Sequence, residues 1–212
     1  YTILFVGSVN VYKDSFGAFA FDAPPAPTPS QNTTESTSHG TDSQNSAEAP
    51  AAFHFESGTL EIGDFDPYTL GDDIFDPCTE ISPEEFAAAG FDNVEPIPEE
   101  YAGLARGLSA CNFTKHSDLP GEGFGNNNAS QKLVKEQTSI LKQYSSDLLP
   151  DVFVYGPKNG IGTHCYAQID TTRGGIVSEA SGLDGYNSQD RTCEVAIENL
   201  DALFAANRSA KH

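Results

Sequence analysis

Four cysteines carry the most distinctive chemistry in this chain: Cys78, Cys111, Cys165 and Cys193. No two of them form a C-x-x-C pair, which argues against a zinc ribbon and against a thioredoxin-type redox motif. An even number of widely spaced cysteines in an acidic chain is typical of disulfides formed in an oxidising compartment. We therefore expect two disulfides and an extracytoplasmic location. The alternative is a cytosolic protein with four buried thiols.

Four cysteines allow three pairings, and the sequence alone does not select one of them. We favour Cys78–Cys111 and Cys165–Cys193, because each pair closes a loop of moderate length. A loop of roughly 30 residues is worth about 3–4 kcal/mol through the entropy of the unfolded chain.

The histidines form no recognisable metal or catalytic motif, since the sequence contains no H-x-H, H-x-x-H or H-E-x-x-H pattern. His164 and its neighbour Cys165 would point to opposite faces of a strand, and a disulfide would remove the thiol that a Cys–His nucleophile needs. No P-loop, dinucleotide-binding glycine motif or nucleophile elbow is present. We predict a protein that is not an enzyme, with no catalytic residue, no metal ligand and no cofactor.

An acidic segment with regularly spaced aromatic residues, residues 53–77, precedes the first cysteine. Its clustered aspartates are Asp64, Asp66, Asp72, Asp73 and Asp76. Calcium prefers carboxylate oxygens, but the spacing does not fit an EF-hand loop and no glutamate stands at its twelfth position. We expect a solvated acidic face rather than a calcium site. The aromatic residues predicted to contact a partner are Phe53, Phe55, Phe65, Tyr68 and Phe75.

The charge of the chain is concentrated in its first half. The formal net charge is −20, and 19 of the 31 acidic residues lie within residues 14–105, where there is no Lys or Arg. Nucleic acids and anionic lipid surfaces would repel such a chain, because both require clustered basic residues. We therefore exclude nucleic acid as a partner. The sequence also contains no run of 18 apolar residues that could form a complete membrane span.

Composition divides the chain into four parts. Residues 1–22 are apolar and aromatic, residues 23–52 are rich in Pro, Ser and Thr, residues 53–77 form the acidic arm, and residues 78–212 contain all four cysteines. The second part cannot bury enough apolar surface to offset the entropy of ordering, so we expect a flexible tether that spans roughly 30 Å.

Three interpretations of residues 1–22 remain open. The segment could be the outer end of a membrane anchor whose beginning lies outside the sequence, or a strand that pairs with a partner. It could also be a signal-peptide remnant, since Ala18-Phe19-Ala20 fits a small-x-small cleavage site. Lys13, Asp14 and the lack of a basic leading region argue against the last interpretation.

Local patterns after Cys78 predict mixed helices and strands. Ser82-Pro83-Glu84-Glu85 is a capping box that begins a short helix ending near Gly90. Helical spacing predicts amphipathic helices over 133–148 and 190–206. Strands are expected at 109–114, 151–155, 163–171 and 174–180, with a turn at 173–175 and a Gly/Asn loop at 121–128. The prediction is an α+β fold with an antiparallel sheet, a few packed helices and two disulfides, preceded by a long extended arm.

The order of several motifs resembles an actinobacterial family of secreted lipoproteins known only as a domain of unknown function. These motifs are Asp76-Pro77-Cys78, the Ser-Pro-Glu-Glu helix, a lone cysteine in a strand, His164-Cys165, and Cys193-x-x-Ala196 at the start of a last helix. The resemblance covers roughly residues 74–206 and implies an exported cell-envelope protein, often lipid-anchored, with no established activity. The chain departs from it in that no lipobox cysteine is visible, and in having Asn112-Phe113 where a Trp-containing strand is expected.

The leading hypothesis is a non-catalytic accessory subunit of a membrane protein complex on the outer face of the plasma membrane or in the cell envelope. Actinobacterial respiratory supercomplexes contain exported accessory proteins, which makes that assembly a candidate by analogy. The alternative is a cell-surface binding module for a lipid, a cell-wall component or a cation, with an apolar cavity between sheet and helices.

Overall fold

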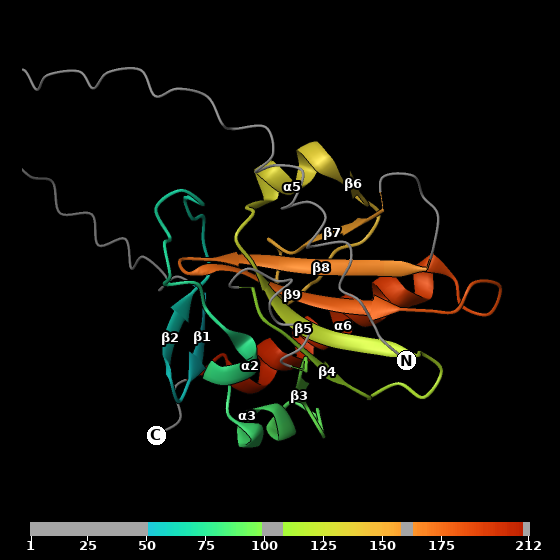
Figure 1. The fold of residues 1–212 in the computed structure, drawn as a ribbon, viewed down its shortest axis with the longest axis horizontal. Coiled ribbons are helices and arrows are strands. Elements are labelled where there is room, and N and C mark those ends of the chain that lie inside the picture. The colour runs from blue at the N-terminus through green and yellow to red at the C-terminus, as the bar shows by residue number, and fades with distance from the viewer. Residues whose placement is uncertain (1–50, 99–107, 158–162, 210–212) are drawn as a thin grey trace, which may run out of the picture.

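The computed structural model describes residues 51–98, 108–157 and 163–209 (Figure 1). The predicted apolar segment 1–22 and nearly all of the predicted tether 23–52 lie outside these ranges. Within them the fold is α+β, as predicted, with antiparallel strands, packed helices and two disulfides. Among the described residues, no helix combines the length and apolar character that crossing a membrane requires.

A seven-stranded sheet, in which each strand pairs antiparallel with its neighbours, is the centre of the fold. Its strands in spatial order are β3 (Glu95–Pro96), β4 (Ala110–Phe113), β5 (Gly121–Asn127), β9 (Gly174–Ser181), β8 (His164–Thr171), β7 (Phe153–Gly156) and β6 (Ser139–Ile140). The long hairpin β8–β9 turns at Arg173 and Gly174, where Gly174 has a φ of 96°. This turn was predicted from the sequence.

One face of the sheet packs against the long helix α6 (Gln189–Asn207), which lies behind the sheet in Figure 1. We call this the α6 face. The disulfide Cys165–Cys193 joins β8 to α6 across this interface, and Cys78–Cys111 joins α2 (Pro77–Glu80) to β4. Both favoured pairings are therefore confirmed, and the predicted last helix is confirmed as well.

The acidic arm predicted at residues 53–77 is part of the folded domain. Its first half forms a two-stranded hairpin, β1 (Ala52–Phe55) and β2 (Gly58–Glu61). Phe53, Phe55 and Phe75 are buried, and Phe53 makes an edge-to-face contact with Phe204 of α6 at 5.2 Å between ring centroids. The hydrophobic core thus includes residues that precede the first cysteine.

The short helix α3 (Pro83–Ala88) follows the sequence signals closely. The Ser82 side chain accepts a hydrogen bond from the Glu85 N–H, and the Glu85 carboxylate accepts one from the Ser82 N–H. Gly90, with a φ of 83°, ends the helix at the left-handed position that glycine favours. Phe86 of this helix stacks on Phe124 of β5 in the core.

Two local predictions are wrong. The expected Gly/Asn loop at 121–128 is β5, a central strand that pairs with β4 on one side and β9 on the other. The expected helix at 133–148 ends at Gln137, so that α5 (Gln131–Gln137) is only seven residues long. Thr138 then leaves helical geometry, and β6 pairs with β7 instead. In both places strand pairing overrides the local pattern.

The face of the sheet opposite α6 has a smaller apolar cluster over β7, β8 and β9. Val134 of α5 packs there with Ala129 against the alternating outward residues of the strands, which are Phe153, Tyr155, Tyr166 and Val177. We call this side the opposite face.

Candidate functional site

Three glutamates are buried in the described part of the chain, and their different partners separate structural roles from a candidate site. Glu85 belongs to the capping box and also accepts the Glu56 N–H at 2.7 Å. Its carboxylate therefore fastens the β1–β2 hairpin to α3. A buried carboxylate held by several N–H donors in this way is a structural group.

The carboxylate of Glu122 on β5 points to the α6 face, and both of its oxygens have hydrogen-bond partners. Its Oε2 accepts the N–H groups of Lys115 and His116 at 3.0 and 2.7 Å, and its Oε1 contacts His116 Nδ1 at 2.7 Å and Asn199 Nδ2 at 3.1 Å. Burial alone would raise the pKa of Glu122, but these hydrogen bonds together lower it. The network ties the loop after β4 to α6.

Glu179 of β9 is different, because its side chain points to the opposite face and has one polar contact within the described ranges. Its Oε1 lies 3.4 Å from His164 Nδ1, while Oε2 has no hydrogen-bond partner within the described part of the chain. The residue is only 1% exposed. Burial raises the pKa of Glu179, and the hydrogen bond to Glu179 raises the pKa of His164. A buried polar atom without a partner requires an explanation.

Strand register places Glu179 among four residues that lie side by side on neighbouring strands, within a longer row from Glu95 to Ile140. The four residues are Asn112 (β4), Gly123 (β5), Glu179 (β9) and Tyr166 (β8), each directly opposite the next. Asn112 Oδ1 is also buried without a hydrogen-bond partner among the described residues. We call these four residues the Glu179 row. It combines two unsatisfied acceptors with a glycine between them.

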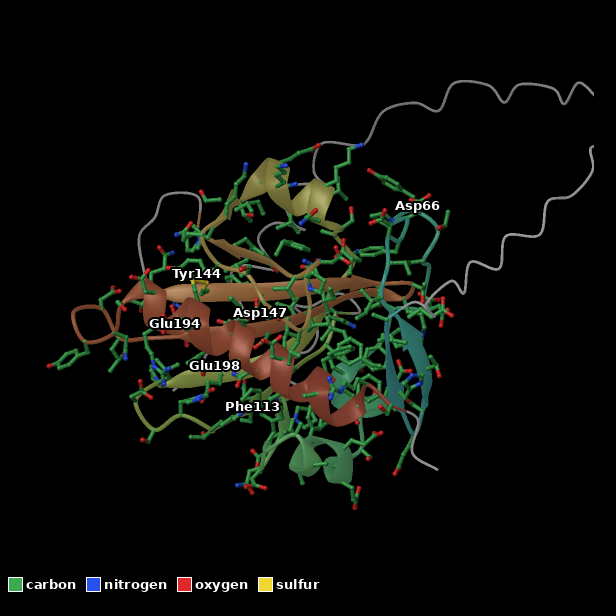
Figure 2. The ribbon with its side chains drawn as sticks, turned by 180° about the vertical axis from the view of Figure 1, so that it is seen from behind. Asp66, Phe113, Tyr144, Asp147, Glu194 and Glu198 are labelled. Carbon is green, nitrogen blue, oxygen red and sulfur yellow. A yellow bond between two sulfur atoms is a disulfide. The ribbon has the colours of Figure 1, made fainter. Side chains whose placement is uncertain are left out.

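A second candidate surface is the acidic loop, which we define as residues 63–76 between β2 and α2. Tyr68 stands on it with 83% of its surface exposed, and Asp64, Asp66 and Asp72 are exposed with it. Figure 2 places Asp66 on this loop, well separated from Glu194 and Glu198 on α6.

The acidic loop is anchored to the β8–β9 turn at both ends. The Gly63 N–H donates to the Asp170 carbonyl, and the Phe75 N–H donates to the Arg173 carbonyl at 2.8 Å. Arg173 forms a bidentate ion pair with Glu80, with N···O distances of 2.7 and 3.0 Å, and contacts Asp73 at 3.2 Å. Tyr68 therefore lies on a loop whose two ends are fixed to the β8–β9 turn.

The predicted partner-contact residues separate into two groups. Phe53, Phe55 and Phe75 are used in the core, so their burial is accounted for within the chain. Phe65 is half-buried on the acidic loop, and Tyr68 is exposed. The four cysteines all form disulfides, with no free cysteine.

The clustered aspartates have individual roles in the described structure. Asp76 caps α2 by accepting the Cys78 N–H, Asp66 accepts the Tyr68 N–H, and Asp73 contacts Arg173. Within the described ranges, no three His, Cys, Asp or Glu side chains are grouped so that they could hold a metal ion.

From the sequence, His164 was a candidate only as a partner for Cys165, and Glu179 was not predicted as a site residue. A carboxylate within the strand Gly-Gly-Ile-Val-Ser-Glu-Ala-Ser was the available signal, because charged residues are rarely fully buried without a partner. The register that places it opposite Tyr166 and beside Gly123 required the structure.

Comparisons of the chain with protein-family models, with curated proteins and with solved structures give no match. The two disulfides indicate an extracellular or periplasmic protein. Fold and site thus define a disulfide-bonded α+β domain with an anchored acidic loop and a buried, incompletely satisfied glutamate.

Proposed function

We propose that this chain is a non-catalytic, extracytoplasmic interaction protein that docks onto a membrane protein complex through its acidic loop. The role we propose is that of an accessory subunit on the outer face of the plasma membrane. An actinobacterial respiratory supercomplex remains a candidate by analogy with the resemblance described above.

The exposure of Tyr68 on an anchored acidic loop is the observation that carries the proposal. Tyrosine contributes large contact area at low entropic cost and is enriched at protein interfaces. Fixing the loop through Arg173 reduces the ordering cost of binding. The surrounding aspartates favour a basic partner surface and would accelerate its association.

The interior of the domain supports an interaction role over the ligand-binding alternative. A cavity between sheet and helices would occupy the layer where Phe124 contacts other aromatic rings of the core. Its ring centroid lies 5.0 Å from both Phe91 and Phe113 and 5.8 Å from Phe86. Side chains therefore occupy that layer.

Site-specific photocrosslinking in native membranes tests the proposal. A photoreactive phenylalanine replaces Tyr68, and the matched control carries the same group at Tyr186, which is 88% exposed on another loop beside Asp184. We expect crosslinks to a membrane protein from position 68 and not from position 186. Equal crosslinking at both positions, or none at either, would count against the acidic loop as the docking surface.

A second variant tests the contribution of the anchor. Arg173→Ala removes the ion pairs to Glu80 and Asp73 and leaves Tyr68 and its aspartates in place. We expect weaker crosslinking from position 68 and faster amide exchange in the acidic loop, because the loop then pays more entropy on binding. Unchanged crosslinking would show that anchoring plays no part.

A further inference from the structure

The Glu179 row contains an unsatisfied polar side chain that is almost completely buried. Glu179 is 1% exposed, and its Oε2 lies on the same face of the sheet as Asn112 Oδ1; neither atom has a hydrogen-bond partner among the described residues. These two atoms are the polar groups that a covering element would have to satisfy. Such groups destabilise the fold when they are left without a partner.

The strand between them, β5, has glycines on this face, of which Gly125 is already covered by the Ser109 backbone. Gly121, Gly123 and Gly125 of β5 alternate on the opposite face, whereas Glu122 and Phe124 point to the α6 face. Since neighbouring strands lie about 4.8 Å apart, Asn112 and Glu179 stand on either side of a glycine strip about 10 Å across. A chain can approach the sheet closely there, and bulky side chains can fill the space above the glycines.

The described helices and strands leave this half of the opposite face without a layer. Val134 of α5 belongs to the apolar cluster over β7, β8 and part of β9, which includes Tyr155, Tyr166 and Val177. In Figure 1, which shows this face, no labelled helix or strand crosses in front of β5. The residues of β5 are nevertheless buried throughout. The burial and the missing layer together point to an occupant.

We propose that residues 1–22 of the same chain pack across the Glu179 row as the missing layer of the opposite face. This segment is rich in large apolar residues, among them Ile3, Phe5, Val9 and Phe16, which suit a glycine strip.

The hydrogen-bond donors of residues 1–22 and the length of the connecting chain are both compatible with packing across the Glu179 row. Tyr12 supplies a hydroxyl group that can donate a hydrogen bond to one of the unsatisfied acceptors of Glu179 and Asn112. Residues 23–50 would span roughly 30 Å as a flexible coil, and 22 extended residues cover about 70 Å. The segments 99–107 and 158–162 are shorter and attached at both ends.

The proposal is independent of the docking function of the acidic loop, because the Glu179 row lies on different elements from Tyr68. Photocrosslinking from position 68 and the experiment below can therefore fail separately.

Carboxyl labelling with a water-soluble carbodiimide, followed by peptide mass spectrometry, tests the proposal. Three glutamates are compared in the full chain and in a variant lacking residues 1–22. Glu194 is exposed and should be labelled in both, while Glu122 is buried by described residues and should be protected in both. We expect labelling of Glu179 to rise by about tenfold or more in the deletion, because its cover is lost.

A synthetic peptide of residues 1–22 should restore the protection of Glu179 when added in trans. The matched control removes residues 29–48, which lie within the Pro, Ser and Thr tract, and should leave Glu179 protected. Continued protection of Glu179 in the variant lacking residues 1–22 would overturn the proposal and assign the cover to another segment. Labelling of Glu179 in the unaltered chain would overturn it as well.

Labelling of Glu122 in the variant lacking residues 1–22 would reveal that this variant does not fold. In that case the full-length variant Gly123→Val provides the test. Valine suits a strand but fills the glycine strip. We expect the full-length variant to expose Glu179 while Glu122 stays protected. Protection of both glutamates in this variant would contradict close packing of residues 1–22 on Gly123.

Discussion

His164 on β8 and Glu179 on β9 are joined by a contact of 3.4 Å between Nδ1 and Oε1, the one polar contact of Glu179 within the described residues. The imidazole is partly exposed, with 42% of its side-chain surface accessible, whereas the carboxyl is buried. Burial raises the pKa of Glu179, and the hydrogen bond to Glu179 raises that of His164. The folded pair therefore binds protons more tightly than the separate groups do in the unfolded chain.

The first prediction concerns the pH dependence of stability. A group with a raised pKa in the folded state stabilises the fold below its unfolded pKa and loses that contribution as the pH rises. The contribution of Glu179 is complete below its ordinary value of 4.5, and that of His164 below 6.5. We expect Glu179→Gln to flatten the decline of the free energy of unfolding above these values. Urea denaturation at a series of pH values measures the free energy of unfolding of both proteins.

The quantity to compare is the difference in the free energy of unfolding between the original chain and Glu179→Gln at each pH. Other titrating groups are present in both proteins, so their contributions cancel in this difference. The difference should move in favour of the variant as the pH rises. A difference that is constant from about pH 4.5 to 8 would mean that the pKa of Glu179 is not raised by folding.

The second prediction is that Glu122→Gln has the opposite pH dependence. Because the pKa of Glu122 is lowered, its contribution is present above the ordinary value of 4.5 and is lost as the pH falls through the folded value. The amide cannot accept hydrogen bonds on its nitrogen, so donors such as the His116 N–H lose their partner. We expect a loss of about 2–3 kcal/mol at neutral pH that shrinks in acid.

Denaturation curves for Glu122→Gln and Glu179→Gln under the same conditions provide the check, since each variant serves as the control for the other. Parallel pH profiles for the two variants would contradict the assignment of different environments to the two glutamates.

Sequence reasoning succeeded where the determining interactions are local. The capping box of Ser82 and Glu85 and the turn at Gly174 depend on residues close in the chain, and both were predicted. The disulfide pairing that was favoured for its moderate loop lengths is the one formed, although the sequence alone does not select among the three alternatives. Strand β5 was missed because Gly-x-Gly reads locally as a loop, whereas its state depends on pairing with β4 and β9.

The same reason explains why the Glu179 row could not be predicted. Asn112 and Glu179 are 67 positions apart in sequence, and only the register of β4, β5 and β9 brings them to the two sides of Gly123. The acidic character of residues 53–77 was plain from the sequence. The division of its aromatic residues into buried Phe53 and exposed Tyr68 depends on how the hairpin packs against α6.

The third prediction tests whether β5 is a central element of the core. Phe124 is fully buried and contacts three other phenylalanine rings. Phe124→Ala should lower the free energy of unfolding by about 3–5 kcal/mol, as for other large-to-small core substitutions. Substitution of the exposed Tyr186 by Ala is the control and should change stability by less than about 0.5 kcal/mol. Similar losses for both variants would be inconsistent with burial of Phe124 in the core.

The fourth prediction concerns the two disulfides. Cys78–Cys111 and Cys165–Cys193 close loops with sequence separations of 33 and 28 residues, so the chain-entropy estimate is about 3.6 kcal/mol for each. The double variants Cys78→Ala/Cys111→Ala and Cys165→Ala/Cys193→Ala should therefore lose similar amounts of stability in urea denaturation. Alanine avoids leaving an unpaired thiol that could exchange with the remaining disulfide.

A thiol count on the denatured, unreduced chain is the companion measurement. We expect no free thiol in the original chain and none in either double variant, because each retains one intact pair. Two free thiols in the variant lacking Cys165 and Cys193 would contradict the pairing of Cys78 with Cys111. Four in the original chain would remove the structural basis for an extracytoplasmic location, since stable disulfides are what tie this fold to an oxidising compartment.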